Sequence, residues 1–486
     1  MAPSKTVRTI SQEAFEGLVR ENMEDLGMDP SEALEDAIQT LTLQGVDLSG
    51  IVTCVPGVTS IKDYPVIQSL DGLKGIAANL VSLSSQDNDK PSATKPSNQK
   101  VEELNTIVDL EQMIELLDKL YALCSIEGSS DASIATRNGG VELVTSICAA
   151  LQARHERPLV SALKALSTFI HDLQSTETFR QSGGPKIVVD ILNNYRENKD
   201  ILDSGFSVVA AAATGNEILK EIFMDLKIDE LLVQIMREQT KGNIHSLYDA
   251  LRVLLTPDDN RVLASQVFGY ARRFAKIGIA GIVVDALREG VNSPCLASAS
   301  IALKAVAVND EICKSIAECG GIDVVLQCID DSGAQNNKAV ASACCSLLSK
   351  LAGSDANKSA IVQKGGLDRL IKLSSIFSED PSVLQEIMSI IWILSLRSPE
   401  SAARAMEAGA GDFAIQAMQK FPAASQMQKQ SCLMIRNLVV RNSENRTILL
   451  GNGIEKIIRK AKQNHDNCKD AAAAALRDLG LDDYNS

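Results

Sequence analysis

The chain has 486 residues, of which 45% are hydrophobic and 23% charged, a composition that can bury a core and excludes a chain that is disordered overall. Aromatic residues make up only 3%, with a single tryptophan, so the core must be built from short side chains. The 48 basic and 62 acidic residues give a net charge of −14, which argues against nonspecific binding to nucleic acid or to an anionic membrane.

The first 50 residues predict an acidic pair of amphipathic helices. The helices are expected at about Ser11–Leu26 and Pro30–Leu43, and Pro30 suits the first turn of the second helix. Three basic residues stand against ten acidic ones in this segment, a net charge of −7. We expect residues 1–50 to form a small domain of their own.

Residues 51–100 are expected to form a largely polar linker. The stretch Ser84–Gln99 is poor in apolar residues and contains Pro91 and Pro96, a composition typical of disordered linkers. Because repeat units take their stability from immediate neighbours, we expect residues 101–486 to fold without residues 1–100.

A short phrase recurs along the rest of the chain: a glycine pair, or two glycines separated by one or two residues, followed by an apolar run. The copies are Gly139-Gly140, Gly183-Gly184, Gly278 with Gly281, Gly320-Gly321, Gly365-Gly366, Gly409 with Gly411, and Gly451 with Gly453. The last glycines of successive copies stand 40 to 45 residues apart, except for one interval of 97 residues. We interpret that interval as two units, with a degenerate copy at Lys227–Leu232. The mean spacing of about 45 residues is typical of HEAT and armadillo arrays.

The residues around each glycine phrase predict three helices per unit. A short polar helix precedes the glycines, a helix with apolar residues at i, i+3 and i+4 follows them, and a longer third helix closes the unit. Glycine suits the corner between the first two helices because it tolerates positive φ. The sequence therefore predicts an all-α, right-handed α-solenoid of about eight repeats over residues 101–480, preceded by the N-terminal helical pair. It ends in a closing helix at Asp466–Leu479, which Gly480 can terminate, and an acidic tail at 481–486.

This pattern resembles the armadillo repeat over about Gln112 to Asp478. Further segments are similar to the armadillo repeat-containing protein six family: Ile10–Phe15, Val19–Asn22, Gln44–Val52, Gln428–Gln430, Ile435–Val439 and Ala474–Gly480. The resemblance implies an armadillo-type architecture rather than a particular activity.

The cysteines and the absence of sorting signals favour a reducing compartment. None of the eleven cysteines forms a C-x-x-C pair, and most fall where a helix would bury them, as expected of small hydrophobic residues rather than zinc ligands. The N-terminus lacks the apolar run of a signal peptide, and no stretch reaches the ~18 apolar residues of a membrane span. We expect a cytosolic protein, with the nucleus as the alternative.

Catalytic motifs are absent from the sequence. Of the four histidines, His245 stands four residues before Asp249, and we interpret the two as a surface pair. The chain has no G-x-S-x-G elbow, phosphate-binding glycine loop or H-E-x-x-H motif. We therefore predict no catalytic, cofactor or metal site, and a small-molecule enzyme is the least favoured function.

The third helices would line the groove of an armadillo array. Resemblance to importin-type and catenin-type arrays implies an asparagine at a recurring groove position, with tryptophan four residues earlier. Here the asparagine position holds Asn437, Ile393, Lys350 and Ala305, and the tryptophan position holds Leu433, Ser389, Ser346 and Ile301. The ladder that reads basic nuclear-transport signals is thus missing, and we predict instead a protein-protein interaction scaffold or adaptor.

Four groove residues are candidates for contact with a partner: Lys350, Trp392, Arg436 and Asn437. Trp392 has two interpretations, as an exposed anchor or as a core residue among its isoleucine and leucine neighbours. Arg436 and Asn437 are expected to lie near the surface, so their substitution by alanine should cost little stability.

An insertion at residues 256–277 adds three further candidates: Tyr270, Arg272 and Arg273. Extra residues within a repeat often form a binding loop at its edge. The alternative is a lengthened first helix whose Phe268 and Phe274 fill the repeat interface.

The C-terminal repeats are basic within an acidic protein. From Ser425 to Asp470, nine basic residues stand against four acidic ones, a net charge of +5. Lys456, Arg459, Lys460 and Lys462 form either a solvated helix face or a surface that docks an acidic segment. That segment could be the protein's own N-terminus, in a weak contact within one chain or between two.

Overall fold

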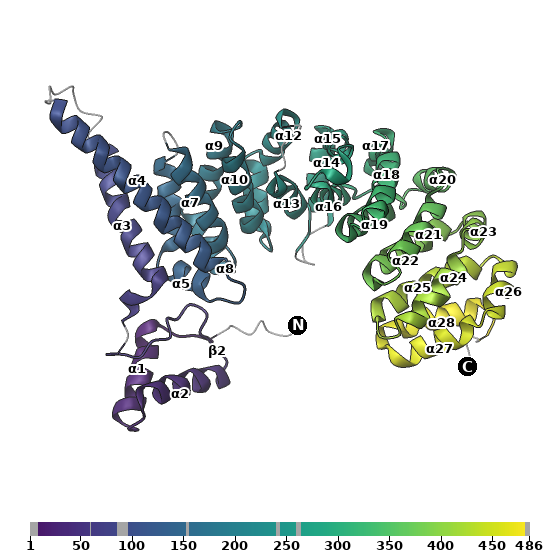
Figure 1. Cartoon of the computed structure of the whole chain (residues 1–486), viewed down its shortest axis with the longest axis horizontal. Coiled ribbons are helices and arrows are strands. Elements are labelled where there is room, and N and C mark those ends of the chain that lie inside the picture. The colour runs from purple at the N-terminus through teal and green to yellow at the C-terminus, as the bar shows by residue number, and fades with distance from the viewer. Residues whose placement is uncertain are drawn as a thin grey trace. The chain divides into compact units, whose positions relative to one another are not determined.

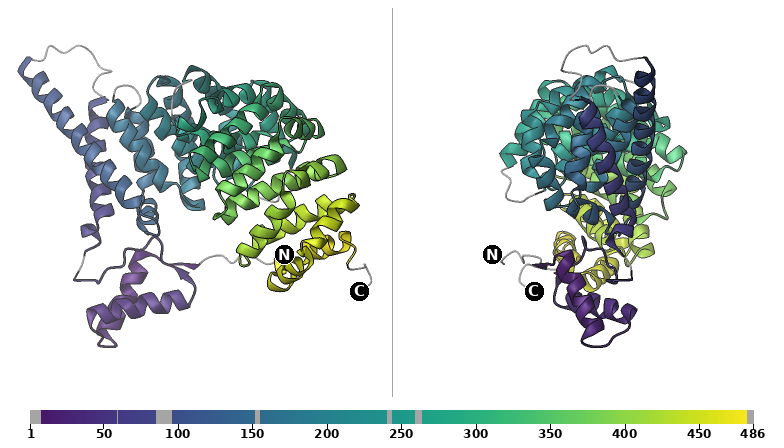
Figure 2. Two further views of the ribbon diagram at one scale, coloured as in Figure 1. Left: turned by 45° about the vertical axis from the view of Figure 1, so that its right-hand side comes forward. Right: turned by 90° about the vertical axis from the view of Figure 1, so that its left-hand side faces the viewer.

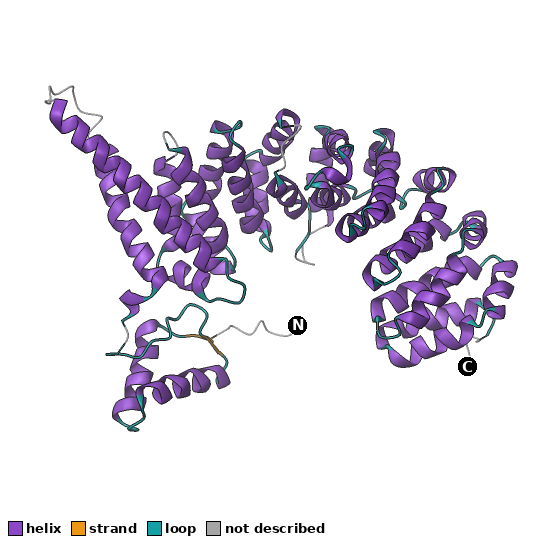
Figure 3. Cartoon of the chain, in the orientation of Figure 1, coloured by secondary structure: helices purple, strands orange, loops and turns teal. Residues whose placement is uncertain are grey.

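The computed structural model describes residues 8–58, 60–84, 96–151, 155–239, 244–258 and 264–481. Within these ranges the regular elements are helices joined by loops, apart from one small sheet in which β1 (Arg8–Thr9) runs parallel to β2 (Val46–Asp47) (Figure 3). The chain divides into two compact units, Met1–Ile228 and Asp229–Ser486. No helix in the described ranges has both the length and the apolar character required to cross a bilayer.

The predicted N-terminal helical pair is confirmed. Helices α1 (Gln12–Glu24) and α2 (Pro30–Leu43) pack through a small core centred on Phe15, Val19 and Leu41. Each helix begins at a side-chain cap, since the Ser11 hydroxyl accepts the Ala14 amide and the Asp29 carboxylate accepts the Ser31 amide.

The structure differs from the polar linker expected at residues 51–100. After a short 3-10 turn η1 (Ile61–Asp63), helix α3 (Pro65–Ser84) buries Val66, Leu70 and Leu73, which follow the i, i+4, i+7 spacing of one helix face. Helix α4 (Pro96–Cys124) begins inside the expected linker and packs against α3 (Figures 1 and 2). Residues 85–95 of the predicted linker lie outside the described residues.

Helices α3 and α4 act as a two-helix cap on the first repeat. They pack on α6 and α7 in the way that the second and third helices of a preceding repeat would. The Tyr64 hydroxyl donates to Asp131 over 2.6 Å, and the Gln12 amide exchanges two hydrogen bonds of 2.9 Å with the backbone of Val52. A chain that starts at residue 101 would therefore lack one side of this cap.

In the described part of the chain, eight three-helix repeats follow the cap, in agreement with the predicted solenoid. The first four are α5 (Asp131–Arg137), α6 (Gly140–Leu151) and α7 (Glu156–Phe169); α8 (Leu173–Gln181), α9 (Gly184–Asn194) and α10 (Lys199–Ala213); α11 (Glu217–Asp225), α12 (Ile228–Glu238) and α13 (His245–Leu254); and α14 (Ala264–Lys276), α15 (Ile279–Leu287) and α16 (Leu296–Val306), with η2 (Gly290–Asn292) before α16.

The last four repeats have the same order of helices. They are α17 (Asp310–Glu318), α18 (Gly321–Ala334) and α19 (Lys338–Leu351); α20 (Asp355–Gln363), α21 (Gly366–Ile376) and α22 (Pro381–Ser395); α23 (Pro399–Glu407), α24 (Ala410–Lys420) and α25 (Ser425–Val439); and α26 (Ser443–Gly451), α27 (Ile454–Asn464) and α28 (Lys469–Asp478), with η3 (Asp466–Cys468) before α28. In the second unit each third helix packs on the next, from α13 to α28.

A residue with left-handed backbone marks the corner between the first and second helix of every repeat. Seven corners use the first glycine of the phrase: Gly139, Gly183, Gly278, Gly320, Gly365, Gly409 and Gly453. The eighth is Lys227, with φ of 61°, which confirms the degenerate repeat. Lys227 and Gly278 stand 51 residues apart, which is more than the mean repeat spacing. Part of the additional length is in α14, which has 13 residues where the first helices α11 and α17 have nine.

The second glycine of a pair is required for a different reason. A Cβ at Gly366 would stand 2.7 Å from the carbonyl oxygen of Ile361 in the preceding helix, whereas a Cβ at Gly365 would meet nothing within 4 Å. Gly365 is thus fixed by its φ of 72° and Gly366 by the close approach of two helices.

The two glycines predict different costs on substitution. Gly365→Ala should destabilise the protein by about 1–2 kcal/mol through backbone strain. Gly366→Ala should cost more, about 2 kcal/mol or above, because backbone must move. Gly451→Ala is the control: this helical glycine has open space, so the change should be neutral or stabilising by up to about 1 kcal/mol. Urea unfolding followed by circular dichroism measures all three, and equal effects at Gly365 and Gly451 would contradict the assignment.

Candidate partner-binding face

The third helices of repeats 4 to 7 lie side by side in the second unit (Figure 1). One side of each helix is buried, through residues such as Leu303, Leu347, Ile391 and Ile435. The other side is exposed or half-buried, and we call it the third-helix face. Its residues are Ile301, Lys304, Ser346, Ser349, Lys350, Ser389, Trp392, Ile393, Leu396, Leu433, Arg436 and Val440.

Polar side chains on this face connect neighbouring helices. The Lys304 ammonium on α16 donates to the Ser346 hydroxyl on α19 over 2.6 Å. The hydroxyl oxygens of Ser349 and Ser389 lie 3.5 Å apart between α19 and α22. Arg436 Nε donates to Asp478 of α28 over 3.0 Å, and the Asp478 side chain is only 11% exposed. These groups hold the helices in register, so their hydrogen-bonding capacity is partly used within the solenoid.

Asn437 lies beneath this face rather than on it. Its side-chain Nδ2 donates to the backbone carbonyl of Trp392 over 2.9 Å, and the residue is 8% exposed. The amide of Leu396, at the end of α22, donates to Ile393 and leaves the Trp392 carbonyl for Asn437. The expectation that Asn437 lies near the surface is therefore wrong: the side chain completes the C-terminus of the neighbouring third helix.

Trp392 is half-buried on α22, whereas Ile390, Ile391 and Leu394 around it are fully buried. The indole thus shows part of its surface on the third-helix face. Leu396 and Val440 add exposed apolar surface, at 38% and 42%. A partner would find here an apolar strip with one large aromatic side chain.

The third helices of repeats 4 to 7 are basic. Helices α16, α19, α22 and α25 contain five lysines and arginines and a single acidic residue, Glu386. Lys350 is exposed at the end of α19. Of the five, Lys304, Lys350 and Arg436 lie on the third-helix face, so this face is opposite in sign to the charge of −14 that the whole protein carries.

An ion pair fixes the start of α22 against α19. Asp380 caps α22 by accepting the amides of Ser382 and Val383, and Lys338 of α19 reaches the same carboxylate at 2.6 Å. Burial alone would raise the pKa of Asp380, but the hydrogen bonds from Lys338, Ser382 and Val383 outweigh it and lower the pKa to about 2.

The candidates at the insertion lie on α14, a first helix, and not on the third-helix face. Arg273 forms two hydrogen bonds of 2.8 and 2.9 Å with the buried carboxylate of Asp229, which identifies it as a structural residue. Arg272 is exposed and Tyr270 half-buried. The described part of the insertion is a lengthened first helix in which Phe274 is buried as expected, whereas Phe268 is 38% exposed and does not fill the interface. Residues 259–263 lie outside the described residues.

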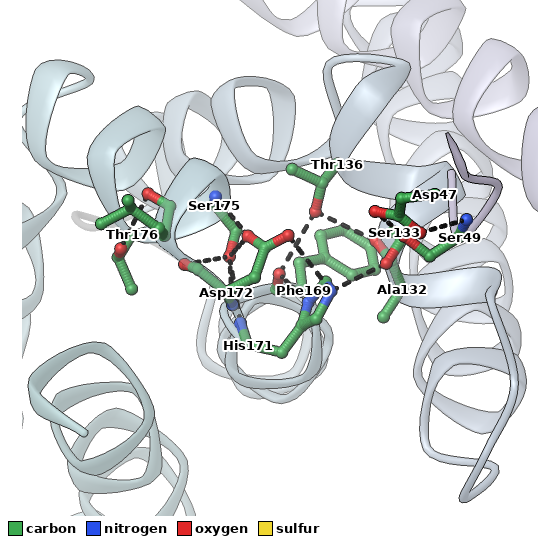
Figure 4. A network of polar contacts seen from close by, with 11 residues as sticks. Asp47, Ser49, Ala132, Ser133, Thr136, Phe169, His171, Asp172, Ser175 and Thr176 are labelled. Carbon is green, nitrogen blue, oxygen red and sulfur yellow. Dashed lines mark hydrogen bonds and ion pairs between the residues drawn. The ribbon is translucent and has the colours of Figure 1, made fainter. Parts of the chain in front are cut away.

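The first unit holds a histidine network that superficially resembles a catalytic triad (Figure 4). His171 Nδ1 lies 2.8 Å from the Phe169 carbonyl, so Nδ1 carries the proton and Nε2 accepts from the Ser133 hydroxyl at 2.9 Å. In a triad the carboxylate faces Nδ1, whereas Asp172 lies 3.7 Å from Nε2 and accepts the Ser175 amide as the cap of α8. The network therefore connects repeats 1 and 2 and lacks the contact between a carboxylate and Nδ1 that defines a catalytic triad.

The other chemically reactive groups have structural surroundings. Asp249 pairs with Arg252 at 3.7 Å and not with His245, so the expected His245–Asp249 pair is wrong. All eleven cysteines are free thiols, nine of them buried, and burial raises the pKa of Cys148 and Cys432 to about 12. Among the described residues, no group of three His, Cys, Asp or Glu side chains could hold a metal ion.

Several residues of this region were not singled out by sequence reasoning. Asp380 with Lys338, and Asp478 beside Arg436, depend on contacts between repeats. Aligning the repeats 44 residues apart could have identified Leu396 and Val440 as equivalent positions, since both directly follow a third helix.

Two family models match the chain. The Armadillo repeat-containing protein 6 N-terminal domain matches residues 7–92, and the LRRK2 ARM repeat matches residues 295–481. Among solved structures, an engineered protein aligns with a TM-score of 0.59 and 16% identity over 86% of this chain and 97% of its own. A chain whose structure is described under a phosphorylation switch that controls the interaction between cadherin and beta-catenin aligns with a TM-score of 0.55 and 14% identity. The alignment covers 86% of this chain and 78% of that chain. Fold and third-helix face together define an armadillo-repeat solenoid.

Relatives extend over most of the chain. Armadillo repeat-containing protein 6 from Homo sapiens is 26% identical over 412 residues, which cover 81% of this chain and 75% of the relative. The Drosophila melanogaster homolog is 26% identical over 416 residues, or 83% and 80%. The chain is thus similar to armadillo repeat-containing protein 6 over most of its length, and its N-terminal segment matches the N-terminal domain of that family.

Asn437→Ala and Arg436→Ala should differ in cost. Asn437→Ala leaves the Trp392 carbonyl without its partner and should destabilise the protein by about 1–3 kcal/mol. Arg436→Ala should cost about 1 kcal/mol or less, because Asp478 keeps a hydrogen bond from Arg477. Asn452→Ala, at an exposed position, is the control and should change stability by less than about 0.5 kcal/mol. Urea unfolding measures the three, and an Asn437→Ala variant as stable as the control would contradict the role of Asn437.

The Asp380 carboxylate should make stability depend on acidic pH. Its folded pKa of about 2 lies below the usual 3.8, so its contribution is complete above about pH 4 and is lost as the pH falls from 4 towards 2. Asp380→Asn keeps a side-chain cap but has no charge, so its thermal midpoint should fall less steeply in this window. Lys338→Met should give an intermediate slope. Parallel curves for Asp380→Asn and the unmodified protein would mean that the carboxylate does not ionise as described.

Proposed function

We propose that this protein is a non-catalytic scaffold that binds a partner protein along the third-helix face. The observation that carries the proposal is that the chain's only tryptophan, Trp392, is half-exposed on the same face as Lys350 and an apolar strip. A surface that combines a tryptophan with apolar and cationic side chains has the composition typical of interface hot spots. A structural neighbour is described in its title through the interaction between cadherin and beta-catenin, an example of protein binding by this fold class.

Charge indicates the kind of partner. The charged residues of the third-helix face, Lys304, Lys350 and Arg436, favour an acidic segment with an apolar side chain for the strip near Trp392. A basic nuclear-transport signal would be repelled by this charge, and the buried Asn437 is already bonded to the Trp392 carbonyl. The free thiols support a reducing compartment, and we propose the cytosol, with the nucleus as the alternative.

Substitution of Trp392 tests the proposal. Partners are first identified by affinity purification with the full chain, and their affinities are then measured with purified protein. Trp392→Ala should weaken binding of the partner by about 2 kcal/mol or more. Lys350→Glu should lower the affinity for an acidic partner and make that affinity depend less on salt concentration. If Trp392 acts only as core, the loss should instead be about 3–5 kcal/mol of stability.

A matched control separates the face from the rest of the solenoid. Ile448→Ala removes an apolar side chain that is 44% exposed on the first helix α26, and it should leave affinity unchanged. A partner that binds Trp392→Ala and Lys350→Glu at full affinity would contradict this assignment of the binding face.

A further inference from the structure

A second surface with the properties of a binding site lies between the second helices of repeats 7 and 8. A groove of about 210 Å³ separates the end of α24 from α27. Met418, Ile457 and Ala461 form its apolar part, and Lys456 and Lys460 line it from α27. Both lysines are exposed and stand one helical turn apart.

The charge of these two lysines is not neutralised by neighbours. In the part of the chain that the structure describes, neither forms an ion pair, whereas Arg459 on the same helix binds Glu455 at 2.8 Å. Residues 425–470 carry a net charge of +5 in a protein of −14. An apolar groove bordered by two uncompensated cations is complementary to a carboxylate-bearing ligand.

The preceding repeat provides an internal comparison. An equivalent groove of about 290 Å³ lies between α21 and α24, and the residues that line it from α24 stand 44 positions before their counterparts on α27. Asp412 and Gln416 occupy there the positions of Lys456 and Lys460, while Ala417 matches Ala461. The repeat architecture therefore produces a groove at both places, although Phe413 and Lys420 also stand there in place of Ile457 and Asn464. The lysines are not needed to build the fold at this position.

We propose that the groove between α24 and α27 binds an acidic peptide segment of a partner protein. One apolar side chain of the segment fills the space over Met418 and Ile457, and flanking carboxylates pair with Lys456 and Lys460. Exposed ion pairs are individually weak and screened by salt, so the contact is of modest affinity and depends on ionic strength. The groove is formed by second helices and is separate from the third-helix face.

The test starts from peptide selection with the full chain. A phage-displayed library of random twelve-residue peptides is panned on the immobilised protein, and the best peptides are synthesised for fluorescence polarisation. The selection should enrich sequences with an apolar residue flanked by Asp or Glu. The double variant Lys456→Asp with Lys460→Gln carries the residue types found in the neighbouring groove, so it should fold. Its affinity for the peptide should be about tenfold lower.

Controls assign the effect to the groove. Lys462→Asp with Arg441→Gln makes the same charge change at positions that do not line the groove, and it should leave the affinity within about twofold. Trp392→Ala should also leave it unchanged, so a failure of the third-helix proposal does not affect this one. Selection without acidic enrichment, or full affinity of the acidic peptides for Lys456→Asp with Lys460→Gln, would overturn the proposal. A single-stranded oligonucleotide that competes with equal affinity would also overturn it, because the surface would then attract any anion.

Discussion

The fold depends on a corner that places a left-handed residue between the first and second helix of each repeat. Within each of the two units, the corner turns the chain so that the second and third helices of successive repeats can stack and share a core. A residue other than glycine is strained in this conformation, which explains why seven corners use glycine and only Lys227 departs from it. Because each repeat buries its apolar side only against its neighbours, the corner also determines which side chains remain outside.

Those outward side chains make the two candidate surfaces. Stacked third helices leave Trp392 and Lys350 on one side of the repeats, and stacked second helices leave a groove that Lys456 and Lys460 border. Both surfaces are basic, although the chain is acidic overall. An acidic chain that concentrates positive charge on particular helices can attract acidic partners while its remaining surface avoids nonspecific contact with polyanions.

Sequence periodicity predicted the repeats well because each corner has a chemical requirement that glycine meets. Even the copy at Lys227 was recognised, since spacing defined where a corner had to fall. Helix α3 was not predicted because it has no glycine corner before it and its apolar residues, such as Val66 and Leu70, lie in a stretch that also contains polar residues. The burial of Asn437 could not be predicted, since it depends on where the neighbouring α22 ends. The charge difference between Asp412 and Lys456 was visible in the sequence, but that they line equivalent grooves required the structure.

The single tryptophan allows the most direct test of the account, because excitation at 295 nm, where tyrosine hardly absorbs, makes Trp392 the source of the fluorescence of the chain. A partner identified by affinity purification, or its acidic segment as a tryptophan-free peptide, is titrated into the full chain while emission and acrylamide quenching are recorded. Binding at the third-helix face predicts a blue shift and protection from acrylamide that saturate together with binding. Saturating binding with unchanged emission and unchanged quenching would show that the partner does not cover Trp392, and would contradict the central claim.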